Sequence, residues 1–155
     1  MPIEPLRLRV INRIVEVLQG IREGDDYFYS PRQVVKGFIA EPKAYPVYMV
    51  TSESGGEINM HSDSNWAETF YVAVRGIVAD MGDVVTPLER AIRDVKKAID
   101  GDMASGLPAT SLGGLVTSLV FDTPAEIDYG FEGTGFLGYF VLRIKIQVDG
   151  TFSEI

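Results

Sequence analysis

The chain has 155 residues, of which 46% are hydrophobic, no cysteine, and a formal net charge of -8. This length fits one domain, in which folding buries roughly two-thirds of the surface that the unfolded chain exposes. Disulfides, thiolate metal sites and a cysteine nucleophile are excluded, and the negative charge argues against general binding to nucleic acid or anionic membranes, which depends on Lys and Arg. Residues 1–5 lack the basic and apolar regions of a signal peptide, and no apolar stretch approaches the length of a membrane span. We therefore expect a soluble protein that is not secreted through a signal peptide.

The first predicted element is a helix from about Pro5 to Glu23, followed by a glycine as a stop signal. Apolar residues at helical spacing form an arc on it: Leu6, Val10, Ile14, Val17, Leu18 and Ile21. Leu8, Ile11 and Val15 widen this arc to roughly half of the helix circumference. A helix that lies on one sheet does not need so wide an apolar face, so either a second element of the chain or a neighbouring copy should cover it.

Two strands are predicted next, a short one near Val34–Ile39 and a second at Pro46–Thr51. Residues 52–65 are polar, contain the pair Gly55-Gly56, and show neither a helical nor a strand period. Loops of this length without structure of their own are uncommon in compact domains unless they bind something or are disordered. We therefore expect a long mobile loop at residues 52–65.

The middle of the chain predicts a long central strand, Trp66–Ala79, and then a helix. Thr86-Pro87-Leu88-Glu89 is typical of a capping box, in which the Thr86 hydroxyl accepts from the Glu89 amide and the Glu89 carboxylate accepts from the Thr86 amide. The apolar stripe behind it is Leu88, Ala91, Ile92, Val95, Ala98 and Ile99, whereas Glu89, Arg90, Arg93, Asp94, Lys96 and Lys97 are expected to face water. We expect the helix to end at Asp100-Gly101.

The last third of the chain predicts an irregular stretch at Met103–Thr110, a strand at Leu112–Thr123, an acidic loop at Pro124–Gly135 and a final strand. In that strand Gly138, Phe140, Leu142, Ile144, Ile146 and Val148 alternate with Tyr139, Val141, Arg143, Lys145 and Gln147. Such alternation is typical of an antiparallel sheet with one face covered and the other in water. The predicted fold class is α+β: one domain over residues 1–155, with a mostly antiparallel sheet and two main helices packed on one face.

Charge is unevenly distributed along the sequence. Residues 52–65 and 122–135 together hold seven acidic residues and no Lys or Arg: Glu53, Glu57, Asp63, Asp122, Glu126, Asp128 and Glu132. The predicted helices carry the basic residues Arg7, Arg9, Arg13, Arg90, Arg93, Lys96 and Lys97. Two interpretations remain open: scattered surface charge that keeps the protein soluble, or opposite-sign patches that pair copies head to tail.

No catalytic or metal-binding pattern emerges. His61 is the only histidine, and its neighbours Ser62 and Asp63 are adjacent in a predicted loop, where a catalytic triad is rarely held. One histidine without cysteine is too few for a usual zinc site, and Asp25-Asp26 and Asp100-Gly101-Asp102 lack the further ligands of a calcium loop. The glycine-rich stretch 130–138 lacks the Gly-Lys-Ser/Thr ending of a phosphate loop and favours a turn or bulge. We assign no catalytic residue, metal ligand or cofactor and expect no enzyme.

The order of elements resembles the tail terminator family of tailed bacteriophages, also called tail-completion or minor tail protein U-like proteins. The resemblance covers nearly the whole chain but consists of pattern and not of a diagnostic motif. The segments that carry it are the helix Leu6–Ile21, the strand Pro46–Val50 with the polar loop after it, the strand Glu68–Val74, the helix Leu88–Ile99 and the strand Phe140–Val148. Neck proteins that share this small α+β design are similar.

The resemblance implies a structural virion protein without catalytic activity. It implies a homo-oligomeric ring, usually a hexamer, that caps the head-proximal end of the tail tube, ends tube polymerisation and joins the tail to the head connector or stopper protein. DNA would pass through it only as cargo, no membrane would be involved, and assembly would take place in the host cytoplasm. The apolar residues that we expect at an oligomer or partner interface are Leu8, Ile11, Val15, Ile58, Met60 and Trp66.

Two further functional classes stay open from the sequence. A small-molecule-binding or hydrolytic α+β domain would need polar groups that converge in an apolar pocket, and the sequence identifies none. A dimeric adaptor, or a phage neck connector other than a terminator, would account for the wide apolar face of the first helix equally well.

Overall fold

The computed structural model describes residues 2–60, 65–105 and 116–151, without the side chains of residues 103–105 and 150–151. Two helices and a six-stranded, mostly antiparallel sheet make up this part of the chain, so the predicted α+β class is confirmed. The elements follow the order α1 (Leu6–Gln19), β1 (Gln33–Lys36), β2 (Val47–Met60), β3 (Asn65–Asp80), α2 (Val85–Ser105), β4 (Ser118–Phe121), β5 (Glu126–Glu132) and β6 (Gly135–Thr151).

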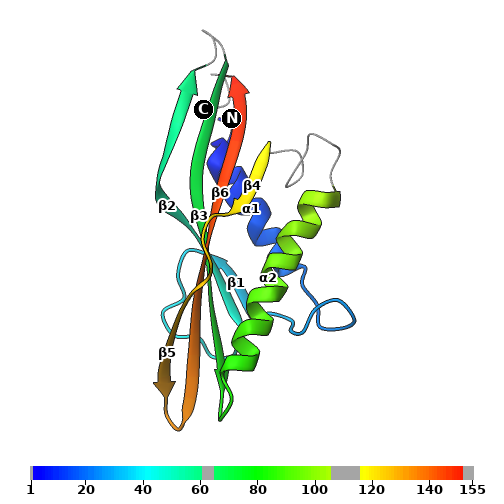
Figure 1. Cartoon of the computed structure of the whole chain (residues 1–155), viewed down its shortest axis with the longest axis vertical. Helices are drawn as coiled ribbons and strands as arrows, with labels where there is room; N and C mark the ends of the chain where they lie inside the picture. The colour runs from blue at the N-terminus through cyan, green and yellow to red at the C-terminus, as the bar shows by residue number, and fades with distance from the viewer. Residues whose placement is uncertain (1, 61–64, 106–115, 152–155) are drawn as a thin grey trace.

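A long antiparallel ribbon of β3 and β6 forms the centre of the sheet (Figure 1). The two strands pair without a break from Asn65 opposite Thr151 to Asp80 opposite Phe136. β2 pairs antiparallel with the other edge of β3, and the short β1 pairs parallel with β2. β6 carries two edge strands on successive stretches, because β5 pairs with residues 135–141 and β4 with residues 144–147.

The alternation predicted for the last strand is confirmed. Every second residue of β6 is buried from Phe140 to Val148, while Lys145 and Gln147 are exposed. The buried set of β6 lies beside the even-numbered buried residues of β3, such as Phe70 and Val74, because the register pairs even positions with even positions. Apolar residues of both helices join the same buried cluster.

The wide apolar face of α1 is covered largely by the chain itself. Leu6, Val10, Ile11, Ile14 and Leu18 are buried, and Val15 and Val17 pack partly buried against the core. Strands and a helix cover this face together, since α1 contacts both the strands β1 and β2 and the helix α2. Of the two explanations that the sequence left open for the wide arc, a second element of the same chain therefore accounts for its buried part.

The loop predicted at residues 52–65 is wrong for residues 52–60, which continue β2 to Met60. Residues 61–64 lie outside the described part, and β3 begins at Asn65. Residues 52–60 show no alternation of apolar and polar side chains, because both faces of the strand are exposed there. Backbone hydrogen bonds to β3, and not side-chain burial, hold this part of β2 in the sheet. Gly55 and Gly56 lie at positive φ, where the register between β2 and β3 shifts, and a side chain at Gly56 would overlap the Thr69 carbonyl oxygen. The glycines therefore mark a β-bulge and not a flexible loop.

Other sequence-based boundaries also differ from the structure. The first helix, predicted to reach Glu23, ends at Gln19 with Gly20 as its C-cap. The acidic loop predicted at Pro124–Gly135 contains β5, and Gly133 at φ 60° makes the turn into β6. The strand predicted at Leu112–Thr123 is confined to Ser118–Phe121 within the described residues; its positions 112–115 lie outside them, as do positions 106–110 of the predicted irregular stretch. α2 does not end at Gly101 but continues to Ser105, because Gly101 is accommodated within the helix.

α2 begins with a different cap from the predicted box. Asp83 accepts hydrogen bonds from the Thr86 amide (3.1 Å) and the Thr86 hydroxyl (2.6 Å), so Thr86 donates to the cap and does not serve as the capping acceptor. These two hydrogen bonds lower the pKa of the Asp83 carboxyl, because they favour its charged form. A carboxylate also suits the positive end of the helix dipole.

Asp94 lies in the core and not on the water-facing side of α2, which corrects the sequence-based prediction. Its carboxylate is fully buried and accepts the backbone amides of Phe28 and Tyr29 at 3.0 Å. Arg93 lies 3.5 Å from the same carboxylate and donates to the Asp26 carbonyl at 2.6 Å. Two consecutive amides that point at one anion form an anion-binding backbone site, so Asp94 fixes the segment between α1 and β1 to the helix.

We expect Asp94→Ala to lower the free energy of unfolding by about 3 kcal/mol, because it leaves two buried amides without an acceptor. Asp94→Asn retains one acceptor oxygen and should lose less. Urea unfolding of both variants measures the difference. Glu89→Ala, on the exposed side of the same helix, is the control and should be nearly neutral; an equal effect of Asp94→Ala and Glu89→Ala would contradict the assigned role.

The Asp83 cap predicts a pH dependence. A carboxyl whose pKa is lower in the folded than in the unfolded state stabilises the fold above its ordinary pKa of 3.8, and this contribution is lost as the pH falls through the lowered value. Asp83→Ala should therefore lower the Tm at neutral pH, and its difference from the native chain should shrink below about pH 4. Thermal melts across this range measure it, and a difference that is constant with pH would refute the cap.

Candidate functional site

The described part of the chain presents open grooves and exposed apolar and charged surfaces. Within residues 2–60, 65–105 and 116–151, no cluster of three or more His, Asp or Glu side chains is placed to hold a metal ion. His61, weighed above as a catalytic candidate, lies outside these residues. In the same part of the chain, neither helix is both long and apolar enough to span a membrane.

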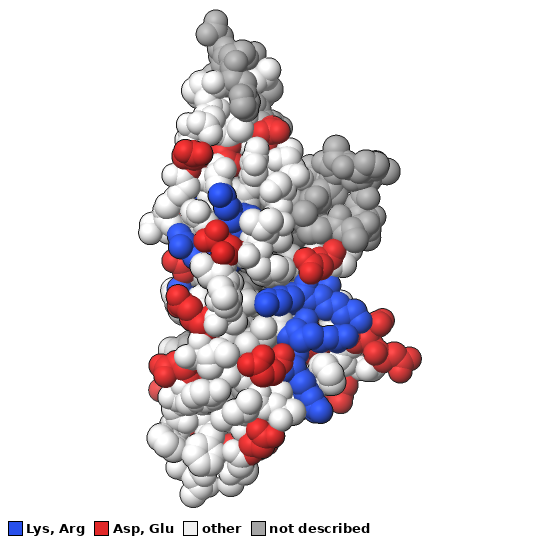
Figure 2. Space-filling view, viewed as in Figure 1, with Lys and Arg blue, Asp and Glu red and all other residues white. Residues whose placement is uncertain are grey.

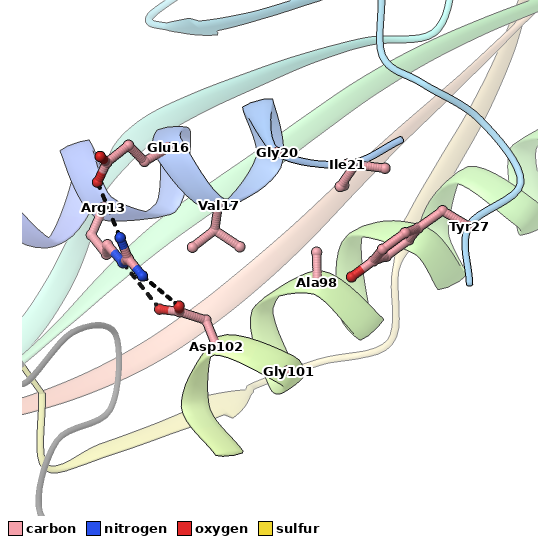
Figure 3. A pocket seen from close by; sticks show the side chains of 9 residues that line it. All are labelled: Arg13, Glu16, Val17, Gly20, Ile21, Tyr27, Ala98, Gly101 and Asp102. Carbon is pink, nitrogen blue, oxygen red and sulfur yellow. Dashed lines mark hydrogen bonds and ion pairs between the residues drawn. The ribbon is translucent and has the colours of Figure 1, made fainter. Parts of the chain in front are cut away.

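An open groove of about 330 Å³ lies between α1 and α2 (Figure 3). Arg13 of α1 donates to both oxygens of Asp102 of α2, at 2.6 and 3.2 Å, and reaches Glu16 at 3.3 Å. The hydrogen bonds to Asp102 raise the pKa of Arg13. Because this guanidinium is already held by two carboxylates, the groove presents a structural ion pair that joins the helices, and no free nucleophile accompanies it.

A second groove of about 330 Å³ lies on the odd-numbered face of the β2–β3–β6 sheet. Arg75 pairs with Glu53 at 2.5 Å, and Arg143 stacks over the Tyr71 ring at 4.0 Å and donates to the Ser54 carbonyl at 3.3 Å. Both guanidiniums therefore have partners within the chain. The arrangement fastens the strands across their open face. Glu126 also lines this groove and forms no ion pair in the described part of the chain.

The residues predicted at an interface fall into three groups. Trp66 is 1% exposed and Ile11 is also buried, so neither is available at the surface of a single chain. Leu8 and Val15 are half-buried on α1. Ile58 and Met60 are 59% and 56% exposed on β2, opposite Glu68 and Trp66 of β3. Of the six, only Ile58 and Met60 present large apolar side chains to solvent.

The sequence-based reasoning missed an apolar surface at the other end of the sheet. Ile127, Tyr129 and Phe131 of β5 and Phe136 of β6, here called the β5 patch, are all exposed, with Phe131 at 78%. The register places Phe131 opposite Phe136, and the rings lie 5.4 Å apart. Figure 2 shows this lower end of the molecule as largely uncharged surface. Exposed apolar patches of this kind mark interaction sites.

The other face of β5 is acidic. Glu126, Asp128 and Glu132 alternate with the β5 patch residues, and all three are exposed. Glu132 accepts a 2.5 Å hydrogen bond from the Tyr45 hydroxyl, and burial followed by this bond raises the pKa of Tyr45 to about 12. In the described part of the chain, Glu126 and Asp128 form no ion pair.

The exposed side of α2 carries four cations, Arg90, Arg93, Lys96 and Lys97, here called the basic stripe, which Figure 2 shows as one blue area over α2. Each lies over an aromatic ring: Arg90 and Arg93 over Phe28 at 4.8 and 5.3 Å, Lys97 over Tyr27 at 5.5 Å, and Lys96 over Phe121 at 5.7 Å. These rings hold the cationic side chains in place. Tyr27 and Phe28 therefore pack against α2.

A comparison of the chain with models of known protein families and with curated proteins finds no match.

Burial now separates two of the predicted interface residues. Ile11→Glu should unfold or strongly destabilise the chain, by about 3 kcal/mol or more, because it places a carboxylate in the core. Ile58→Glu, at an exposed strand position, should change stability by less than about 0.5 kcal/mol. Circular dichroism melts of the two variants compare them, and a folded, equally stable Ile11→Glu chain would show that α1 is not packed as described.

Proposed function

We propose that the protein is a structural subunit that assembles into a ring at the head-proximal end of a bacteriophage tail tube. In this role it ends tube polymerisation and joins the tail to the head connector or stopper protein. The observation that carries the proposal is the combination of an exposed apolar surface with a free strand edge. Within the described chain β5 pairs only with β6 and carries the β5 patch, which a monomer would leave in water.

The packing of the helices supports this proposal. Gly138 of β6 lies directly against the side chains of Val84 and Leu88, because a Cβ added at this glycine would lie 3.2 and 3.3 Å from them. Leu88 belongs to α2, so α2 covers the even-numbered face of the ribbon at this point. Arg7 of α1 lies over the Phe70 ring at 5.0 Å, and Phe70 belongs to the same face. We infer that both helices lie on one face. The opposite face and both sheet ends then remain for contacts with other subunits.

The proposed subunit has no catalytic role. The grooves between the helices and on the sheet are held by ion pairs within the chain, so they support a small-molecule-binding or hydrolytic function poorly. The net charge of -8 disfavours binding to DNA phosphates, as suits a ring through which DNA passes as cargo. These observations fit a terminator and also another ring-forming neck connector, and the resemblance in element order favours the terminator.

Assembly should depend on the β5 patch. We expect native mass spectrometry and light scattering of the purified protein to show a closed homo-oligomer, and Phe131→Asp to shift it toward monomer with little change in Tm, because Phe131 is exposed in the monomer. Phe38→Asp is the matched control: Phe38 is 74% exposed, and the same substitution there should leave the oligomer intact.

The terminator role itself is tested with the tail tube protein of the same phage. Adding the protein to polymerising tubes should give tubes that stop growing and carry a ring at one end, as seen by electron microscopy. A protein that stays monomeric at all concentrations, with and without tube protein, would contradict the ring. A ring that leaves tube growth unchanged would favour another neck position.

A further inference from the structure

We propose that the acidic, aromatic tip of one copy, formed by β5 and its turn into β6, docks on the basic stripe of α2 in the next copy. The partner is thus a second copy of this chain in head-to-tail orientation. The inference rests on the proposed ring and specifies which two surfaces form its repeating contact.

Charge selects this pairing. Residues 122–135 contain four carboxylates and no Lys or Arg, and among the described residues Glu126 and Asp128 form no ion pair. On α2, Arg90 and Lys96 likewise form no ion pair within the described chain, although Arg93 and Lys97 are occupied by Asp94 and Asp26. Glu126 lies away from the tip, in the sheet groove beside Arg75 and Arg143, and Arg90 lies outside the α2 groove. The monomer therefore leaves Asp128 at its tip and Lys96 in the α2 groove without an ion pair in the described part of the chain, and one contact between copies would bring these two together.

The shape and the side chains of the α2 groove also suit the β5 tip. An open groove of about 620 Å³ runs along the exposed side of α2, where Arg93, Lys96 and Lys97 contribute cations and Ile92 lies buried at its floor. Every cation of the basic stripe already lies over an aromatic ring of its own chain. An aromatic side chain such as Phe131, delivered by a neighbour, would meet the same favourable cation–π environment. Glu89 and Asp100 also line the groove and would oppose an acidic tip.

The other exposed apolar end of the sheet is a poorer partner for the tip. Ile58 and Met60 are accompanied by Glu57 on β2 and by Glu68 on β3, whose carboxylate lies 4.0 Å from the Arg7 guanidinium. Bringing that end to the tip would place carboxylates against carboxylates, which disfavours association. The tip and the basic stripe are different surfaces of one chain, so their contact is heterologous and repeats around a ring if the rotation closes.

A charge-exchange experiment tests the contact. Lys96→Glu and Asp128→Lys should each weaken self-association about tenfold or more, whereas the double variant, which exchanges the two charges within one chain, should restore it. Lys145→Glu changes the net charge as Lys96→Glu does but lies on β6, outside the groove, and should have no effect. Asp100→Ala removes an opposing charge and should strengthen association. Sedimentation velocity and native mass spectrometry give the constants, with circular dichroism confirming that each variant is folded.

Cross-linking gives an independent readout, because the chain contains no cysteine. A mixture of Lys96→Cys and Thr134→Cys chains should form a disulfide-linked heterodimer, while neither variant alone should cross-link efficiently. A native protein that is monomeric would overturn both the ring and this contact. A native ring that is insensitive to both charge reversals, or single variants that cross-link to themselves, would overturn the head-to-tail contact alone.

Discussion

The length of the β3–β6 ribbon constrains the rest of this structure. β6 has 17 residues, which extend about 55 Å at the usual rise of a strand, whereas the 21 residues of α2 span only about 30 Å. The helix can therefore cover little more than half of the ribbon along its length. Beyond the helix the strands continue with backbone pairing alone, as in residues 57–60 of β2, or with apolar side chains left in water, as in β5. The exposed ends of the sheet are a consequence of this mismatch.

Asp94 is the second constraint, because it decides how the chain passes from α1 to the sheet. A buried carboxylate is unfavourable unless it is hydrogen-bonded, and here two consecutive amides and a neighbouring guanidinium compensate it. The same segment brings Tyr27 and Phe28 against α2, where they lie under Lys97, Arg90 and Arg93. The buried anion thus positions the rings, and the rings order the cations that we assign to a contact with the next copy.

The sequence predicted the elements whose burial follows a simple period, and it failed where other interactions hold the chain. β6 alternates cleanly because every second side chain enters the buried cluster, and the apolar stripes of both helices follow because they belong to the same cluster. β2 beyond Thr51 could not be recognised, since it is exposed on both faces and a two-glycine bulge interrupts its register. β5 does alternate, with Ile127, Tyr129 and Phe131 as the apolar set, but its acidic residues suggested a loop. Recognising its period of two would have revealed the β5 patch.

Single polar residues were the hardest to place, because their environment depends on contacts distant in sequence. Asp94 belongs to the charged face of α2 by helical spacing, and only the approach of Phe28 and Tyr29 makes its position a core position. Among the apolar residues, Trp66 and Ile58 both looked like candidates for an interface. They differ because Trp66 is buried on the central strand, whereas Ile58 lies on the part of β2 beyond its pairing with β1, where one edge of the strand is unpaired in the described chain. Position within the sheet, and not hydrophobicity, therefore decides which of these apolar residues stay exposed, and the exposed ones lie on β5 and on the part of β2 beyond its pairing with β1.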